Sequence, residues 1–216
     1  GMDGATVDTD SDGLLSDEAL DEQLTVTGTA ATAALTVTGG GGADTIIGGT
    51  VNDTLSGGGG DDTITGTAGG NDTVNGGAGN DTIDMGATLT AKDTIDGGAG
   101  SDTLIVTQLN SDALAGVSNV ETLAFNGTAT ISANLAFDTI DLTNGSATDS
   151  LTLGTGYTSA TTVKVDAGDT VVNTAADVAL TVTGTATGVA TSTITGADKA
   201  GVTNTATVTV DGTAWD

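Results

Sequence analysis

The sequence predicts an all-β protein whose central part is a right-handed parallel β-solenoid, a flattened coil of short stacked strands. Three observations predict this fold class. An Asp-Thr-apolar step recurs seven times, glycine-rich stretches separate the steps, and the 216 residues include 35 Gly but no Pro. Aromatic residues make up only 2% of the chain, which suits a narrow core of Val, Ile and Leu.

The spacing of the recurring step defines the coil. Its acidic residues are Asp44, Asp53, Asp62, Asp72, Asp81, Asp93 and Asp102, at intervals of 9, 9, 10, 9, 12 and 9 residues. A unit of this length with one short strand is half a coil, so alternate strands stack in parallel on the same face. The expected inward residues are Ile46, Ile64, Ile83 and Leu104 on one face, and Leu55, Val74 and Ile95 on the other. A related phrase, Leu24–Gly28, recurs as Leu35–Gly39, so we expect the coil to span 24–106.

The charge of the chain restricts its partners. Acidic residues number 29 against 3 basic ones, for a net charge of −26, and all acids but Glu18, Glu22 and Glu121 are Asp. Asp is typical of turns and of sites for hard cations, and self-repulsion opposes folding unless counter-ions bind. The charge argues against nucleic acid as a partner. No run of about 18 apolar residues predicts membrane insertion, and the absence of His and Cys disfavours zinc or copper.

Four stretches follow the pattern Gly-Gly-x-Gly-x-Asp-x-apolar-x, namely Gly39–Ile47, Gly57–Thr65, Gly76–Asp84 and Gly97–Ile105. With the imperfect copies between them, they resemble the RTX (repeats-in-toxin) β-roll. This resemblance implies that several Ca²⁺ ions bind between successive Gly-Asp turns, through Asp carboxylates and backbone carbonyls. The implied ligands are the seven Asp residues given above together with Gly40, Gly42, Gly58, Gly60, Gly77, Gly79, Gly98 and Gly100.

The two edges of the predicted roll differ in regularity. Asp44, Asp62, Asp81 and Asp102 belong to perfect repeats and share one edge, which we call the regular edge. Asp53, Asp72 and Asp93 share the other, the irregular edge, where Val51 replaces a Gly, residues 66–71 hold an extra residue, and an insertion places Lys92 beside Asp93. We therefore predict a row of three ions along the regular edge, between the turns of Asp44 and Asp62, Asp62 and Asp81, and Asp81 and Asp102. The irregular edge is predicted to be weaker or partly empty.

Residues 1–23 form an acidic segment with a second candidate site. Asp8, Asp10, Asp12 and Gly13 match positions 1, 3, 5 and 6 of an EF-hand-like calcium loop, but position 12 is Ala19 instead of Glu. A calcium site and a solvated acidic tail both remain open. Ser16 is a candidate N-cap for a short helix reaching Gln23, and the start of the chain shows no signal-peptide pattern.

The region 107–216 is expected to contain a cap and Thr/Ala-rich strands. Residues 110–115 favour a short helix or cap over the end of the roll. Period-two runs predict strands at 121–125, 139–142, 151–153, 162–165, 170–172, 179–183, 193–195 and 206–210. An irregular β-solenoid and a small β-sandwich both fit these runs, and the scarcity of large core residues favours the solenoid.

The function expected from these features is structural. The RTX resemblance, with a looser one between Asn119–Leu123 and bacterial surface-layer proteins and adhesins, implies a calcium-binding module of a secreted or cell-surface protein. The chain would be exported unfolded by a type I secretion system and would fold outside the cell when calcium binds. Further copies of the chain in a lattice, or a cell-surface polysaccharide, are its expected additional partners. The alternative is an accessory roll of a secreted RTX enzyme or toxin. No enzyme is expected in this chain, because it lacks a His base, a Cys nucleophile and a Gly-x-Ser-x-Gly elbow. Ice binding is disfavoured because the turns show no Thr array, and sugar binding because exposed aromatic residues are too few.

Overall fold

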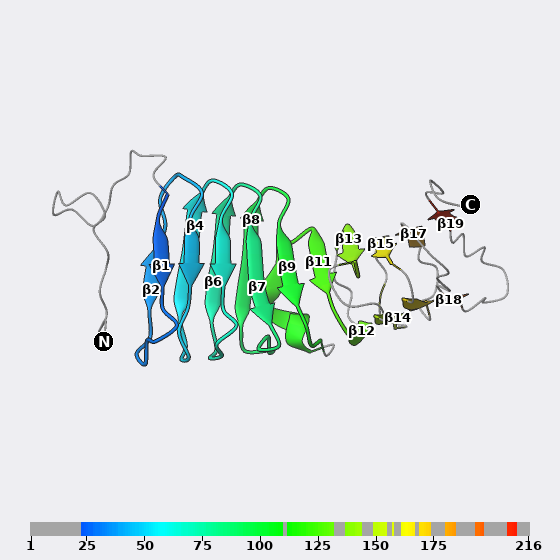
Figure 1. The fold of residues 1–216 in the computed structure, drawn as a ribbon, viewed down its shortest axis with the longest axis horizontal. Coiled ribbons are helices and arrows are strands. Elements are labelled where there is room, and N and C mark those ends of the chain that lie inside the picture. Colours follow the sequence, from blue (N-terminus) through cyan, green and yellow to red (C-terminus); the bar gives the residue numbers. More distant parts are fainter. Residues whose placement is uncertain are drawn as a thin grey trace. The chain divides into compact units, whose positions relative to one another are not determined.

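The computed structural model describes residues 23–109, 112–131, 137–143, 149–154, 157, 161–166, 169–173, 180–184, 193–196 and 207–210. The chain divides into two compact units (Figure 1). The first contains the residues up to Ile105 together with Ala115–Val120, and the second contains Val106–Leu114 and the residues from Glu121 onward.

The first unit consists of two parallel sheets, between which the chain alternates. One sheet holds, in order, β1 (Thr25–Thr27), β3 (Thr45–Ile47), β5 (Thr63–Thr65), β7 (Thr82–Gly86) and β9 (Thr103–Val106). The other holds β2 (Thr36–Thr38), β4 (Thr54–Gly59), β6 (Thr73–Ala78), β8 (Thr94–Ala99) and β10 (Val117–Ser118). Successive strands of a sheet are therefore one full coil apart along the chain, as the spacing of the Asp residues predicts.

The core of the first unit is formed mainly by one apolar residue at the same position of successive strands, with Met85 of β7 as a further buried side chain. In the first sheet Ile46 pairs in register with Ile64, and Ile64 with Ile83. In the second, Leu55 pairs with Val74, and Val74 with Ile95 in turn. These side chains and that of Leu104 are at most 1% exposed, so the seven predicted inward positions are confirmed. Stacking like on like fills a narrow core without aromatic residues.

The strands of the second sheet are longer than the repeat predicts. The repeat predicts a glycine turn followed by a short strand, but β4, β6 and β8 have 6 residues each and include the first three positions of the glycine segment. Gly58 pairs with Gly77, and Gly77 with Gly98. Positive φ angles of 108°, 117° and 105° at these residues let the backbone stay in the ladder while it begins to turn.

The second unit is also built from parallel strands, which confirms the solenoid and excludes the sandwich. Its strands are β11 (Thr122–Phe125), β12 (Thr128–Ile131), β13 (Thr139–Asp141), β14 (Ser150–Leu153), β15 (Thr161–Val165), β16 (Thr170–Asn173), β17 (Leu180–Gly184), β18 (Thr193–Gly196) and β19 (Thr207–Val210). The odd-numbered strands form one series of neighbours and the even-numbered strands another. All eight predicted runs overlap a strand, whereas β12 was not predicted.

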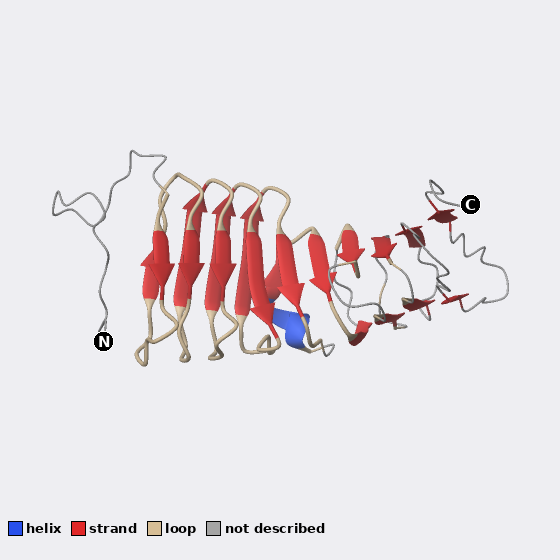
Figure 2. Cartoon of the chain, in the orientation of Figure 1, coloured by secondary structure: helices blue, strands red, loops and turns tan. Residues whose placement is uncertain are grey.

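The remaining sequence predictions concern helices. A 3₁₀ helix, Ala113–Gly116, overlaps the short helix expected at 110–115 (Figure 2). The predicted EF-hand-like loop and the helix after it lie outside the described residues, apart from Gln23. In the described part of the chain, no helix has the length and apolar character needed to cross a membrane.

Candidate calcium sites

The seven repeat carboxylates lie inside the roll rather than on its surface. Each Asp of the repeat is 3% exposed or less, although each immediately precedes a strand at a turn. Among the described residues, no group of three or more acidic, His or Cys side chains is arranged to hold a metal ion. A cation at these turns must therefore take most of its ligands from backbone carbonyls, with few carboxylates.

One oxygen of each carboxylate connects successive coils. On the regular edge the Asp44 N–H donates to Oδ1 of Asp62 at 2.7 Å, and the Asp62 N–H donates to Oδ1 of Asp81 at 2.8 Å. The Asp81 N–H donates to Oδ1 of Asp102 at 2.8 Å. The irregular edge has the same pattern, from Asp53 to Asp72 at 2.9 Å and from Asp72 to Asp93 at 2.7 Å. Oδ1 thus has a structural role that the sequence prediction, which treated these residues only as ligands, did not include.

The second oxygen distinguishes the two edges. On the regular edge, Oδ2 of Asp62 and Oδ2 of Asp81 are buried and have no hydrogen-bond partner. A buried carboxylate oxygen without a partner is costly. At the first coil of this edge, Oδ2 of Asp44 accepts from the Gly40 N–H at 2.7 Å. The regular edge therefore contains carboxylate oxygens whose burial a bound cation or a proton would offset.

A backbone carbonyl lies beside each of these oxygens. A Cβ added to Gly57 would collide with Oδ2 of Asp62 and with the carbonyl oxygen of Gly76 from the next coil. A Cβ on Gly76 would likewise meet Oδ2 of Asp81 and the carbonyl oxygen of Gly97. The glycine hydrogen leaves a small cradle, against which one carboxylate and one carbonyl oxygen converge. Such hard oxygen donors suit Ca²⁺.

The carbonyls in these cradles belong to the first glycine of each repeat. The sequence analysis named the second and fourth glycines as ligands, and that assignment stays a prediction. The structure uses those glycines for close stacking, because a Cβ on Gly58 would meet the Gly40 carbonyl and a Cβ on Gly60 would meet that of Gly42, 2.7 Å away. The same stacking recurs in the following coils, for Gly77, Gly79, Gly98 and Gly100.

The electrostatics of the regular edge favour a positive charge beside its carboxylates. The pKa of Asp62 is raised to about 6, chiefly because burial disfavours its charged form. The hydrogen bond from Asp44 lowers this pKa, and the Asp81 and Asp44 carboxylates raise it. Burial also raises the pKa of Asp81, with Asp102 and Asp61 contributing repulsion. A cation in the cradles would remove both the burial penalty and the repulsion between carboxylates.

The irregular edge satisfies the second oxygen of two of its three carboxylates within the protein. Oδ2 of Asp53 accepts from the Gly49 N–H at 2.6 Å. Oδ2 of Asp93 accepts from the N–H and the hydroxyl of Thr90, at 2.7 and 3.0 Å. Where a Cβ of Gly66 would stand, its nearest neighbour is the Met85 sulfur, 2.7 Å away, and not a carbonyl oxygen. A thioether is a poor ligand for a hard cation, so this edge offers fewer donors to calcium.

The second unit repeats the carboxylate ladder with residues that the sequence prediction did not name. The Gly127 N–H donates to Oδ1 of Asp149 at 2.7 Å, and the Asp149 N–H donates to Oδ1 of Asp169 at 2.9 Å. The Asp166 N–H donates to Oδ2 of Asp169 at 2.8 Å, so both oxygens of Asp169 are already used. The missed signal is an Asp before a short Ser/Thr-apolar strand, the same signal as in the roll.

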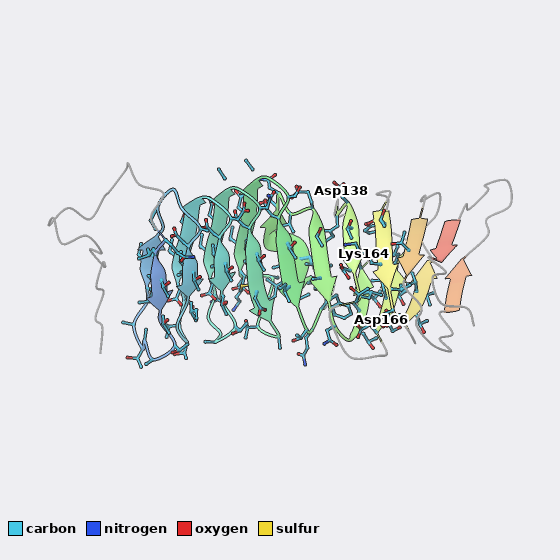
Figure 3. The ribbon with its side chains drawn as sticks, turned by 45° about the horizontal axis from the view of Figure 1, so that its top comes forward. Asp138, Lys164 and Asp166 are labelled. Atoms are coloured by element: carbon cyan, nitrogen blue, oxygen red, sulfur yellow. The ribbon has the colours of Figure 1, made fainter. Side chains whose placement is uncertain are left out.

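One lysine of the second unit reduces local repulsion. Lys164 on β15 pairs in register with Asp141 on β13, and its ammonium lies 3.1 Å from the Asp141 carboxylate. Figure 3 labels this lysine among the side chains of the second unit. Although burial acts to raise the pKa of Asp141, hydrogen bonds from Thr143 and Lys164 lower it overall. This carboxylate is therefore neutralised without a metal ion.

Comparison with known proteins agrees with the geometry of the first unit. The family model of the RTX calcium-binding nonapeptide repeat, in four copies, matches residues 38–70, 67–87 and 90–106. Neither the curated proteins nor the solved structures include a significant match to the chain. The repeat-bearing part of the first unit is an RTX calcium-binding β-roll, as the nonapeptide pattern predicts.

Proposed function

We propose that this chain is a structural module of a secreted or cell-surface bacterial protein, and that calcium drives its folding outside the cell. The observation that carries the proposal is the pair of buried Oδ2 atoms on Asp62 and Asp81, which have no hydrogen-bond partner. Each faces a carbonyl of the next coil across a glycine cradle. Folding without calcium would bury these charges uncompensated.

Calcium stabilises the roll by mass action, because the cradles exist only when successive coils are stacked. An ion at 100 times its dissociation constant contributes about 2.7 kcal/mol to the folded state, and extracellular calcium modules bind with dissociation constants of about 10⁻⁴ to 10⁻³ M. The net charge of −26 adds repulsion that bound cations reduce. A chain of this kind stays unfolded in a low-calcium cytoplasm, which suits export through a type I secretion system.

We assign the main ion file to the regular edge, between 44/62, 62/81 and 81/102. The support is the recurrence of an Asp Oδ2 and a first-glycine carbonyl beside Gly39, Gly57 and Gly76. It is strongest beside Gly57 and Gly76, because Oδ2 of Asp44 at Gly39 already accepts from the Gly40 N–H. The irregular edge is weaker, because Asp53 and Asp93 already accept hydrogen bonds at Oδ2.

Within this function, a surface-layer or adhesin role is favoured over an accessory domain of an enzyme. The adjacent acids Asp61 and Asp62 resemble a catalytic dyad only in sequence. Asp61 accepts from the Asn80 N–H at 2.7 Å and Asp62 accepts from the Asp44 N–H, so both stack coils. Assembly with further copies or attachment to a surface polysaccharide is part of the same proposal.

The test is a far-ultraviolet circular dichroism titration of chelator-treated protein with calcium, and with magnesium in parallel. We expect a cooperative gain of β signal with calcium in the micromolar-to-millimolar range and none with magnesium, which prefers a tighter octahedral shell. A full β signal that persists after chelation would overturn calcium-driven folding. Light scattering at saturating calcium tests assembly separately.

A further inference from the structure

We propose that the roll binds one more cation beyond its RTX repeats, at a site closed by the backbone carbonyl of Asn119. This inference rests on the proposed calcium binding of the roll. Gly97 and Asp102 lie within the family match, but Asn119 lies beyond its end at residue 106. The sequence analysis placed the last ion between Asp81 and Asp102, so neither assigns the Asn119 carbonyl as a ligand.

The cradle at Gly97 has the composition of the cradles before it. A Cβ on Gly97 would stand 2.8 Å from Oδ2 of Asp102 and would collide with the carbonyl oxygen of Asn119. At Gly76 the corresponding atoms are Oδ2 of Asp81 and the Gly97 carbonyl oxygen. Asn119 therefore supplies the oxygen that the first glycine of a fifth repeat would supply, without any further Gly-Asp turn.

The register of β10 explains this position. Val117 pairs with Ile95 and Ser118 with Asp96, so Asn119 follows opposite Gly97, where the first glycine of a repeat belongs. Asn119 has a φ of 49° and is the one non-glycine residue with positive φ in the described part of the chain. Its side-chain amide donates to the Asp96 carboxylate at 2.7 Å, which fixes this turn. Asn is the residue type that tolerates this conformation best after Gly.

The chemistry of the cradle selects a hard cation. Asp102 is fully buried, and its Oδ1 already accepts from the Asp81 N–H at 2.8 Å. The charged carboxylate oxygen of Asp102 and the partly negative carbonyl oxygen of Asn119 both lie close to Gly97. An anion would be repelled there, whereas Ca²⁺ would take both oxygens as ligands. The positive φ of Asn119 is then part of the site, because this backbone conformation directs the Asn119 carbonyl toward Gly97.

The test compares two substitutions at Asn119 that differ in tolerance of positive φ. Asn119→Gly keeps this conformation available, and Asn119→Val, being β-branched, strongly disfavours it. Native mass spectrometry of calcium-loaded protein is expected to show equal ion counts for the parent and Asn119→Gly, and one ion fewer for Asn119→Val. An unchanged count in Asn119→Val, or the loss of one ion from both variants, would show that the carbonyl is not a ligand.

Anomalous scattering from calcium-grown crystals of the parent protein decides the matter if Asn119→Val fails to fold. The expected result is a peak about 2.3–2.6 Å from both Oδ2 of Asp102 and the Asn119 carbonyl oxygen. Peaks beside Gly57 and Gly76 with none beside Gly97 would refute the added site but leave the proposed function intact. If no anomalous peak appears and calcium causes no change in the circular dichroism, both the added site and the proposed function are refuted.

Discussion

Two glycines of β4 offer a matched test of the cation cradle. Neither Gly57 nor Gly59 has positive φ, so alanine fits the backbone at both positions. A Cβ on Gly57 would fill the cradle formed with Asp62 and Gly76, whereas a Cβ on Gly59 would meet only ordinary contacts, the nearest at 3.7 Å. We expect Gly57→Ala to weaken calcium-dependent folding and Gly59→Ala to leave it nearly unchanged.

The size of the effect follows from two contributions. Crowding in a closely packed site costs about 1–3 kcal/mol, and losing an ion held at 100 times its dissociation constant costs about 2.7 kcal/mol more. A tenfold change in free calcium changes the binding free energy by about 1.4 kcal/mol for each bound ion. If about three ions bind cooperatively, the lost free energy therefore raises the free-calcium midpoint of Gly57→Ala about tenfold. Gly59→Ala gains about 0.4–1 kcal/mol from a less flexible unfolded chain, which lowers the midpoint less than about twofold.

The assay is the calcium titration of the β signal in calcium-buffered solutions, repeated for the parent and both variants. Ion counting at saturating calcium accompanies it, because Gly57→Ala should also lose an ion. Equal midpoints for the two variants would show that the point beside Gly57 is not a ligand position. A large shift with an unchanged ion count would attribute the effect to crowding alone.

Two further predictions concern the carboxylates. Asp62→Asn keeps an acceptor for the Asp44 N–H but removes the charge, so it raises the calcium midpoint several-fold. Asp53→Asn disturbs the bond from Gly49 without removing a proposed cation ligand, so it raises the midpoint less. Equal calcium shifts in both variants would contradict the difference between the edges. In chelator, the folded-state pKa of Asp62, about 6, lies above the ordinary value of 3.8, so its ionised form opposes folding above about pH 6, and this penalty is lost as the pH falls toward 3.8. Circular dichroism should therefore show more β structure at pH 5 than at pH 7 without calcium, and a flat profile would refute this.

The periodic part of the fold was predictable because each coil repeats the same physical problem. An apolar residue at a fixed offset from each Asp can only be buried if the coils stack in register, as Ile46, Ile64 and Ile83 do. The strand β12 escaped prediction because its buried residues, Ala129 and Ile131, include one of the smallest apolar side chains, and Thr-Ala alternation gives little contrast between its two faces.

The details of the candidate sites were less predictable, because they depend on backbone direction. Which glycine carbonyl points at Asp62 is decided by φ angles that a run of glycines leaves open. The Met85 side chain beside Gly66 comes from β7 of the next coil, because the pairing of Thr65 with Asp84 places Met85 opposite Gly66. Asn119 carries no glycine signal at all, and only the register of β10 places its carbonyl.

The separate roles of the two oxygens of each carboxylate would couple folding to the proposed cation binding on the regular edge. Oδ1 of Asp81 holds the Asp62 backbone of the preceding coil, and this bond fixes the carboxylate plane and so the direction of Oδ2. Stacking a coil therefore creates a ligand and a buried charge in the same step. On the irregular edge, Gly49 and Thr90 donate to the second oxygens of Asp53 and Asp93, so stacking leaves these two oxygens partnered. A single ion file on the regular edge is then sufficient to make the whole roll depend on calcium, because neither edge can stack without the other.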